Sequence, residues 1–269
     1  MLLGMDSIAT QHSPSPAWSS RLPGWALSRG RAPSDVDAAF AAGIALKSLD
    51  DLIRADPPWL GCWRDRFALK SATVAARMFG RSGEETAIRD AVLLTGSGDD
   101  PGPAGKLFLA TRMLVRRTGT ITTPFVRELA TLLGMKWDDG LASIPDMVDT
   151  TIQSGRLVPL VVAELISAMT ATRPDAEVMA LGLAETVLAQ KLNWPKPVPL
   201  LLPERYGPAF RTIGGVVASG RANRLTQKQS GLRWSTVLRQ RCAPPSKSID
   251  GPNGYWRWRR RCGQKVPRR

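Results

Sequence analysis

Apolar residues recur at helical spacing through most of the chain, beginning with "SDVDAAFAAGIALKSLDDLIRAD" (residues 34–56). They follow one another every three or four positions, which is the period of one face of an α-helix. Ser34, with Asp37 three residues later, is a capping-box pattern that predicts the start of this helix. The pair Pro57–Pro58 predicts its end, because proline interrupts the helical hydrogen-bond ladder.

The same period predicts further helices along the body of the chain. Ser82 and Glu85 form a second capping box, and Gly80 predicts the end of the helix before it. The segment Gly96–Gly105 is dense in Gly and Pro and is predicted as a loop. The predicted helices cover about residues 62–79, 84–95, 106–117, 124–134, 143–154, 158–172 and 175–193. No run shows the alternation typical of a strand, so we expect an all-α, multi-helix globular body.

The composition changes at both ends of this body. Residues 1–33 are rich in Ser, Pro, Gly and Arg without periodicity, and we expect them to be mostly irregular. The segment "WPKPVPLLLPERYGPAFRTIGG" (residues 194–215) contains five prolines around an apolar cluster. This pattern predicts an extended segment wrapped around the helices. The predicted organisation is an irregular N-terminal segment 1–33, a helical domain 34–215 and a low-order basic tail 216–269.

The positive charge of the chain is concentrated in that tail. The full sequence has 37 Lys and Arg against 23 Asp and Glu, a formal net charge of +14. From Val216 onward there are 14 basic residues and one acid, Asp250, which leaves 23 basic and 22 acidic residues for 1–215. A strongly basic balance normally indicates a polyanionic partner. Here it describes the tail alone, because the body is close to neutral.

The tail ends in "GYWRWRRRCGQKVPRR" (residues 254–269), where aromatic residues alternate with arginines. In a genuine tail, nucleic-acid bases would stack on the aromatic rings while the arginines neutralise phosphates. The resulting binding would be independent of sequence and sensitive to salt, for example in plasmid maintenance. Nucleic acid is therefore a partner only if the tail is genuine. The residues concerned are Tyr255, Trp256, Arg257, Trp258, Arg259, Arg260 and Arg261.

A different interpretation of the tail comes from its codons. When the third base of each codon is joined to the first two bases of the next, Tyr255–Trp256 forces Leu. This shifted frame permits "IDRRAERLLALAAKVRTKGA" for residues 247–267, "ALVDGAAALRSAL" upstream of it, and "RGVRPGEPTDP" for 216–227. A peptide laden with Trp and Cys thereby becomes an amphipathic helix that carries acids. We interpret residues 216–269 as a frameshift product, so that one or two core helices are missing and apolar surface of the body is left exposed.

Three blocks of the body carry a family resemblance. They are "WALSRGRAPSDVDAAFAAGIALKSLDDLIRADPPWLGCWRDRFALK" (residues 25–70), "RDAVLLTGSGDDPGPAGKLFLA" (89–110) and "KPVPLLLPERYGPAFRTIGG" (196–215). Over about 18–215 the chain resembles an uncharacterised family of alphaproteobacterial, rhizobial-type proteins that are often plasmid-borne. Members of that family continue after "RTIGG" with a turn and Ala/Leu-rich helices, whereas this sequence departs at about Val216. The resemblance implies no activity, cofactor or site, because the family is known only as a domain of unknown function.

Two groups of polar residues in the body are candidate sites. Asp99 and Asp100 lie in a Gly/Pro loop, where paired carboxylates can hold a hard cation or perform acid–base chemistry. The alternative is a solvated turn. The stretch "PERYGPAFR" places Arg205, Tyr206 and Arg211 on a proline-stiffened segment. There they either bind a phosphate or carboxylate ligand or attach the segment to the helices by hydrogen bonds.

The residue types present exclude several classes of chemistry for the body. The single histidine, His12, precedes the helices, and two of the three cysteines lie in the tail. A Ser-His-Asp triad, a Cys-His pair, a multi-histidine metal site and a disulfide framework are thereby excluded. The longest apolar stretch, Leu157–Ala171, is too short to span a bilayer, and no signal peptide is recognisable.

These observations lead to one leading expectation and two alternatives. We expect a soluble, cytoplasmic helical protein without a cofactor and without membrane association, acting as a binding or regulatory module on an unknown ligand and not as an enzyme. The first alternative is non-specific nucleic-acid binding through the tail. The second is a metal enzyme that uses Asp99 and Asp100 together with Arg205.

Overall fold

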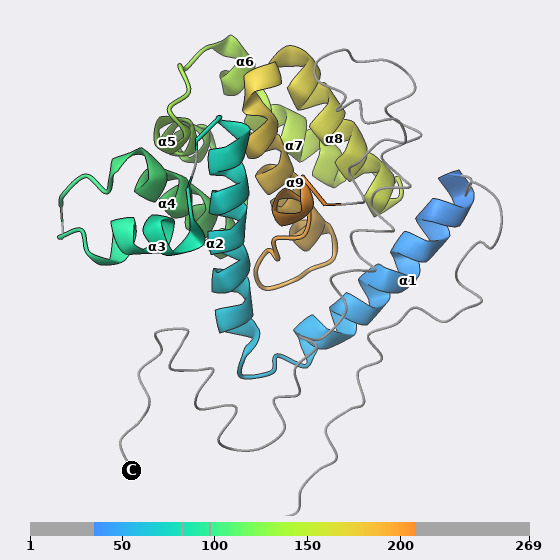
Figure 1. The fold of residues 1–269 in the computed structure, drawn as a ribbon. Helices are drawn as coiled ribbons and strands as arrows, with labels where there is room; N and C mark the ends of the chain where they lie inside the picture. Colours follow the sequence, from blue (N-terminus) through green and yellow to red (C-terminus); the bar gives the residue numbers. More distant parts are fainter. Residues whose placement is uncertain (1–34, 82, 97, 208–269) are drawn as a thin grey trace, which may run out of the picture.

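The computed structural model describes residues 35–81, 83–96 and 98–207, in which helices are joined by short loops (Figure 1). Within these ranges no strand is present, which confirms the expected all-α, multi-helix body. The helices are α1 (Asp35–Arg54), α2 (Leu60–Met78), α3 (Glu85–Leu93), α4 (Gly102–Arg116), α5 (Thr123–Leu133), α6 (Asp139–Ala142), α7 (Ile144–Gln153), α8 (Val158–Thr172) and α9 (Glu177–Lys191), with 3-10 turns at Pro174–Ala176 and Leu202–Glu204.

The start of α4 differs from the sequence prediction. The predicted loop Gly96–Gly105 is too long, because α4 begins at Gly102 and includes Pro103 in its first turn. Proline is tolerated there, since the N–H groups of the first turn have no partner within the helix. Asp100 stabilises the turn before α4, because its Oδ1 accepts a hydrogen bond from the Gly102 N–H at 2.8 Å.

Two glycines end helices through left-handed backbone conformations. Gly80 has φ +68° and Gly134 has φ +71°, a region that only glycine enters without steric cost. At each position the next N–H reaches back to a carbonyl in the last helical turn, 2.9 Å from Arg81 to Ala76 in the case of Gly80. The predicted end of α2 is thus confirmed, whereas the predicted start signals Ser34 and Ser82 lie outside the described residues.

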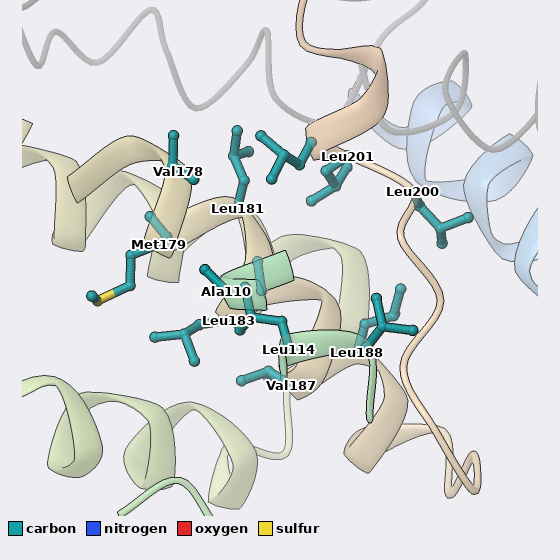
Figure 2. Packing of buried hydrophobic residues seen from close by; sticks show 14 of the residues in the cluster. Ala110, Leu114, Val178, Met179, Leu181, Leu183, Val187, Leu188, Leu200 and Leu201 are labelled. Atoms are coloured by element: carbon teal, nitrogen blue, oxygen red, sulfur yellow. The ribbon is translucent and has the colours of Figure 1, made fainter. Parts of the chain in front are cut away.

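The hydrophobic core is built around α9, which is buried on every side. Residues 178–189 of this helix are all buried, and Glu185 and Thr186 are the polar residues among them, as expected for a mostly apolar helix in the core. Figure 2 shows Leu183 of α9 beside Ala110 and Leu114 of α4. A Cβ atom added to Gly182 would clash with a methyl group of Leu114. Glycine at this position therefore permits the close approach of α4 and α9.

The helices form two groups on either side of α2, and α9 contacts α7 and α8 of its own group and α4 of the other. In Figure 1, α3, α4 and α5 lie on one side of α2, while α7, α8 and α9 lie on the other. The pairing of α2 with α4 is tight enough for the buried Thr111 hydroxyl to donate to the Ala68 carbonyl at 2.9 Å. Among the described helices, none is both long and apolar enough to cross a membrane.

Helix α1 is tied to the chain that follows α9. The Trp194 Nε1–H donates to Asp50 Oδ1 at 2.9 Å, and Arg54 Nη2 donates to the Leu192 carbonyl at 3.3 Å. The Arg54 guanidinium, and then the Trp194 N–H, hold the pKa of Asp50 below its ordinary value, although partial burial acts in the opposite direction. These contacts join residues that are far apart in sequence and fix the end of α1.

In the segment predicted to be extended from Trp194, the chain bends at residues 195–196, is neither helix nor strand over 197–200, and then makes the 3-10 turn Leu202–Glu204. A buried carboxylate holds it in place. Glu185 of α9 is only 4% exposed, and its Oε1 accepts hydrogen bonds from the backbone N–H groups of Leu200, Leu201 and Leu202 at 2.8, 2.7 and 3.1 Å. Such bonding compensates for the burial of a charged group. Residues 208–215 of the predicted segment lie outside the described ranges.

Candidate functional site: a groove between two helices

The two aspartates of the predicted metal site lie in the turn before α4. Asp100 accepts from the Gly102 N–H and forms an ion pair with Lys106 at 2.7 Å. The Lys106 ammonium, followed by the Gly102 N–H, lowers the pKa of Asp100. Asp99 folds back toward Gly96, where an added Cβ atom would lie 2.7 Å from the Asp99 carboxylate. In the described ranges no group of three or more His, Cys, Asp or Glu is arranged to hold a metal. Among the described residues, the carboxylate pair therefore has no third His, Cys, Asp or Glu beside it that would complete such a group.

The arginine and tyrosine of the second predicted site contact the helices beneath them. Arg205 Nε donates to Glu177 Oε1 at 2.5 Å, at the first turn of α9. The Tyr206 ring centroid lies 5.4 Å from the Arg77 guanidinium carbon and 5.9 Å from that of Arg205. These contacts fit the alternative in which the residues attach the segment to the body. Arg211 lies outside the described residues, as do all seven tail residues predicted to contact nucleic acid.

A different feature of the body has the shape of a binding site. Helices α7 and α8 border a groove of about 400 Å³, which we call the α7–α8 groove. Each helix contributes one stripe of side chains at positions i, i+3, i+4 and i+7, so that the two stripes line the same space. The stripes are Met147, Thr150, Thr151 and Ser154 from α7 and the residue after it, and Val161, Glu164, Leu165 and Ala168 from α8, with Arg156 at one end.

The floor of the groove is apolar and its α7 side carries hydroxyl groups. Val161 and Leu165 are buried, and Met147 is half-buried beside them. The hydroxyls of Thr150 and Thr151 donate to carbonyls of their own helix, each at 2.8 Å. Because those donors are already used, they place no unsatisfied polar hydrogen in the groove. An apolar surface can therefore pack against this wall.

The rim of the groove carries one ion pair. Arg156 Nη1 lies 2.5 Å from Glu164 Oε2. Leu157, in the loop between the two helices, is 64% exposed and does not line the groove. An ion pair at a surface contributes little to stability, but it places one positive and one negative group at the entrance. A partner with charges of both signs beside an apolar face would be oriented by it.

The end of α7 is held in place by a lysine of the core helix. Lys191 Nζ lies 3.4, 3.0 and 2.6 Å from the carbonyl oxygens of Thr151, Ile152 and Ser154. These carbonyls belong to the C-terminal turn of α7, where a cation is favoured by the helix dipole. The same turn carries the last two positions of the α7 stripe. The geometry of the groove is thus fixed from α9.

The sequence pattern predicts both helices of the groove but not the groove itself. Periods of three and four residues are present in 143–154 and 158–172, and both helices are observed with nearly those bounds. One feature of the sequence could have indicated a groove. The helix α8 is apolar on more faces than one neighbouring helix can cover. Which two faces meet depends on the path of the chain between Ser154 and Val158, and the period does not determine it.

Comparison with known proteins gives a family without a known activity. The family model described as "Protein of unknown function (DUF1403)" matches residues 11–236. No curated protein and no solved structure matches the chain. The matched range covers the entire described body and continues past Val216, so it does not itself locate the departure of the tail.

Proposed function

Since the chain belongs to the DUF1403 family, whose description assigns no function, we propose from its geometry that it is a binding module that receives an amphipathic helix of a partner protein in the α7–α8 groove. The observation that carries this proposal is the pair of facing helical stripes, at 147–154 and 161–168, with an apolar floor between them. Amphipathic helices bind grooves of this kind through side chains at i, i+3, i+4 and i+7.

The length of the groove supports a helix more than a compact ligand. Each stripe covers two helical turns, or roughly 10 Å of helix. Ala168 and the hydroxyl residue Thr150 are small, which allows the backbone of a third helix to approach closely. A partner helix would place its apolar residues over Met147 and Ala168, above the already buried Val161 and Leu165. The remaining apolar surface of Met147 and Ala168 would be covered by the partner, because apolar surface removed from water is the main driving force of such docking.

The rim charges give the proposal a preferred orientation. Arg156 follows the C-terminal turn of α7 and pairs with Glu164 of the α8 stripe. A partner helix with an acidic residue opposite Arg156 and a basic residue opposite Glu164 would exchange the internal ion pair for two external ones. Rim charges of this kind mainly set orientation and association rate, so most of the affinity would come from the apolar floor.

The peptide "IDRRAERLLALAAKVRTKGA", permitted by the shifted codons, is a suitable probe. It carries Leu, Leu, Ala and Val at the required spacing, and its net positive charge prevents attraction to the basic tail. We expect it to bind with a Kd on the order of 10 µM, measured by fluorescence anisotropy of a labelled peptide. The substitution Ala168→Arg places a long side chain in the groove and is expected to weaken binding at least about tenfold.

Ala171→Arg is the matched control, because Ala171 lies on the same helix, is exposed like Ala168 and does not line the groove. We expect it to leave the affinity within about twofold of the unmodified chain. A peptide of the same composition in scrambled order is the second control. Equal binding of the scrambled peptide, or equal effects of the two substitutions, would contradict the proposal.

The other expectations from the sequence stay proposals. Nucleic-acid binding through residues 255–261 is supported by their composition alone, and metal chemistry at Asp99 and Asp100 by the carboxylate pair alone. We also propose, on the resemblance over residues 18–215, a bacterial and cytoplasmic protein with the three-part organisation 1–33, 34–215 and 216–269.

A further inference from the structure

The two adjacent leucines at the end of α3 form an exposed apolar patch. Leu93 is the last residue of α3 and is 65% exposed, and Leu94, which follows it, is 83% exposed. No other large apolar residue in the described ranges is as exposed as Leu94. A single exposed leucine is common at a protein surface, whereas two neighbours at a helix end offer a patch that a partner can cover. We call them the α3 leucine pair.

Helix α3 attaches to the body through its opposite face. Ile88 is fully buried, and Val92, one turn later, is half-buried against the hydrophobic core. This face packs on α2 and α4. The attachment of α3 therefore uses little of the leucine pair, which is left for another contact.

One turn before the leucine pair, α3 carries one charge of each sign. Arg89 Nε donates to Asp90 Oδ1 at 2.9 Å, and both side chains are nearly half exposed. Residues four positions apart lie on the same side of a helix, so Arg89 lies one turn from Leu93 and Asp90 one turn from Leu94. The outer face of α3 thus combines a pair of charges with an apolar end.

The α7–α8 groove has the complementary arrangement. On α8, Glu164 precedes Ala168 by the same four residues, and Arg156 lies against Glu164. A helix that runs parallel to α8 can therefore bring Arg89 to Glu164 and Leu93 to Ala168 in a single register. The neighbouring acid of α3 is then available to Arg156. The charges of the two surfaces are thus opposite in sign where they meet, which favours this orientation.

The leucine pair and the groove lie on different sides of the molecule. In Figure 1, α3 is on one side of α2, and α7 and α8 are on the other. Both elements belong to the packed body, so neither surface reaches the other within one chain. A surface patch that complements a groove elsewhere on the same molecule is a means of self-association.

We propose that α3 of one copy of this chain docks in the α7–α8 groove of a second copy. This inference rests on the proposed function of the groove and names the helix that the groove receives. The contact covers two helical turns, or roughly 10 Å of helix, and is smaller than a standard protein interface. It is therefore expected to be weak, with a Kd on the order of 100 µM.

Sedimentation velocity of the full chain over a range of concentrations around that value measures the association. We expect the weight-average mass to rise with concentration. Leu93→Gln combined with Leu94→Gln is expected to weaken association at least about tenfold, and so is Ala168→Arg on the groove side. All three positions are exposed, so the fold is expected to be kept.

Leu157→Gln is the matched control, because Leu157 is 64% exposed but belongs neither to α3 nor to the lining of the groove. We expect it to leave the association within about twofold of the unmodified chain. The basic tail is the same in every variant, so it does not account for differences between them.

A mixture of the two deficient variants tests the pairing directly. The chain with Leu93→Gln and Leu94→Gln keeps an intact groove, and the chain with Ala168→Arg keeps an intact α3. One complementary pair of surfaces remains between them. With one variant labelled by a dye, the mixture is therefore expected to form a 1:1 dimer at concentrations at which each variant alone is monomeric.

The proposal is overturned if the mixture stays monomeric. It is also overturned if only the leucine substitutions weaken association, since α3 would then contact another surface, or if only Ala168→Arg does, since another segment would then occupy the groove. A chain that is monomeric at all concentrations but binds the probe peptide would overturn self-association alone. A monomeric chain that does not bind the peptide would overturn the proposed function as well.

Discussion

The body and the tail of this chain use charge in opposite ways. Residues 1–215 hold nearly equal numbers of basic and acidic residues, whereas residues from Val216 onward hold 14 basic residues and one acid. In the body the acids are structural: Asp50 accepts from Trp194, and Glu185 accepts from three backbone N–H groups. A segment almost without acids has no means to make such bonds. The net charge of +14 is therefore a property of the tail and says little about the folded part.

This contrast supports the proposal that the tail is read out of frame. In the shifted frame, the codons of residues 247–267 permit a helix that carries acids and an apolar face, so the tail would acquire the character of the body. The family match does not decide the matter, because it continues to residue 236. Three predictions test the contrast, and the strongest comes first.

The first prediction would remove the contrast altogether. Resequencing the gene across the codons for Arg211 to Arg221 is expected to show one base too many or too few. The chain made from the restored frame is expected to unfold at a midpoint roughly 10 °C higher than that of the chain as written. For a chain of this size, this shift corresponds to a free energy of unfolding that is larger by about 3–5 kcal/mol. The physical reason is that an added amphipathic helix buries apolar surface on the body. Differential scanning calorimetry of the two chains measures the difference.

The opposite outcome is equally informative. If the frame stands as written, the tail residues Arg257, Arg259, Arg260 and Arg261 become the leading functional candidates. Replacing these four by Gln is then expected to reduce the slope of log Kobs against log salt by up to about 3.6 for duplex DNA. A positive gel shift alone would not distinguish the two cases, because so basic a peptide binds nucleic acid in either of them.

The second prediction compares an acid of the body with the acid of the tail. Glu185→Ala is expected to lower the free energy of unfolding by ~3 kcal/mol, because three buried N–H groups lose their acceptor. Glu185→Gln keeps one acceptor oxygen and is expected to cost less. Asp250→Asn, at the only acid of the tail, is the matched control and is expected to change stability by less than about 0.5 kcal/mol. Urea denaturation measures all three, and equal effects at Glu185 and Asp250 would contradict the assignment.

The third prediction concerns acid. Arg173 Nη1 lies 2.5 Å from Asp138 Oδ2, and its Nη2 lies 2.6 Å from Asp175 Oδ2. The pKa of Asp175 is lowered mainly by Arg173, and that of Asp138 by the Leu141 N–H and then by Arg173. Because a lowered pKa favours the charged carboxylate in the folded state, this stabilisation is present above the ordinary aspartate pKa of 3.8 and is lost as the pH falls below it.

Arg173→Gln is therefore expected to flatten the dependence of the unfolding free energy on pH below about 4. The slope measures the number of protons taken up on unfolding, and we expect that number to fall by less than about one. Both carboxylates are substantially exposed, so this is the smallest of the three effects. Lys136→Gln is the control, since the Lys136 side chain makes no ion pair among the described residues and its carbonyl still accepts from Arg173. A slope unchanged by Arg173→Gln would show that the pairs do not contribute.

Helix content was predictable from the sequence because it follows from local periodicity. The bounds of α2, α7 and α8 agree with their apolar patterns to within a few residues. The start of α4 was not predicted, because Gly102 and Pro103 were interpreted as loop residues. That interpretation did not consider that proline is tolerated in the first turn of a helix. The tie between Glu185 and Leu200–Leu202 was not predictable either, since nothing local distinguishes an acid on a buried helix from an acid on an exposed one.

The candidate sites were less predictable than the fold. Asp100 and Arg205 stood out in the sequence because of their chemistry, and the structure gives each a nearby partner, Lys106 and Glu177 respectively. The α7–α8 groove lacks such conspicuous residues. It arises where two helices meet at a particular rotation, which is a consequence of tertiary packing and has no signature in the sequence.

The position of Glu185 has a consequence for synthesis on the ribosome. Its three N–H donors belong to residues 200–202 and are translated after all of α9, so the carboxylate has none of them until that stretch has left the exit tunnel. Completion of the body therefore depends on translation through Leu202. A lesion at codons 211–221 falls after this point. The ribosome can thus release a helical body in which these three hydrogen bonds are complete, whichever frame supplies the residues that follow.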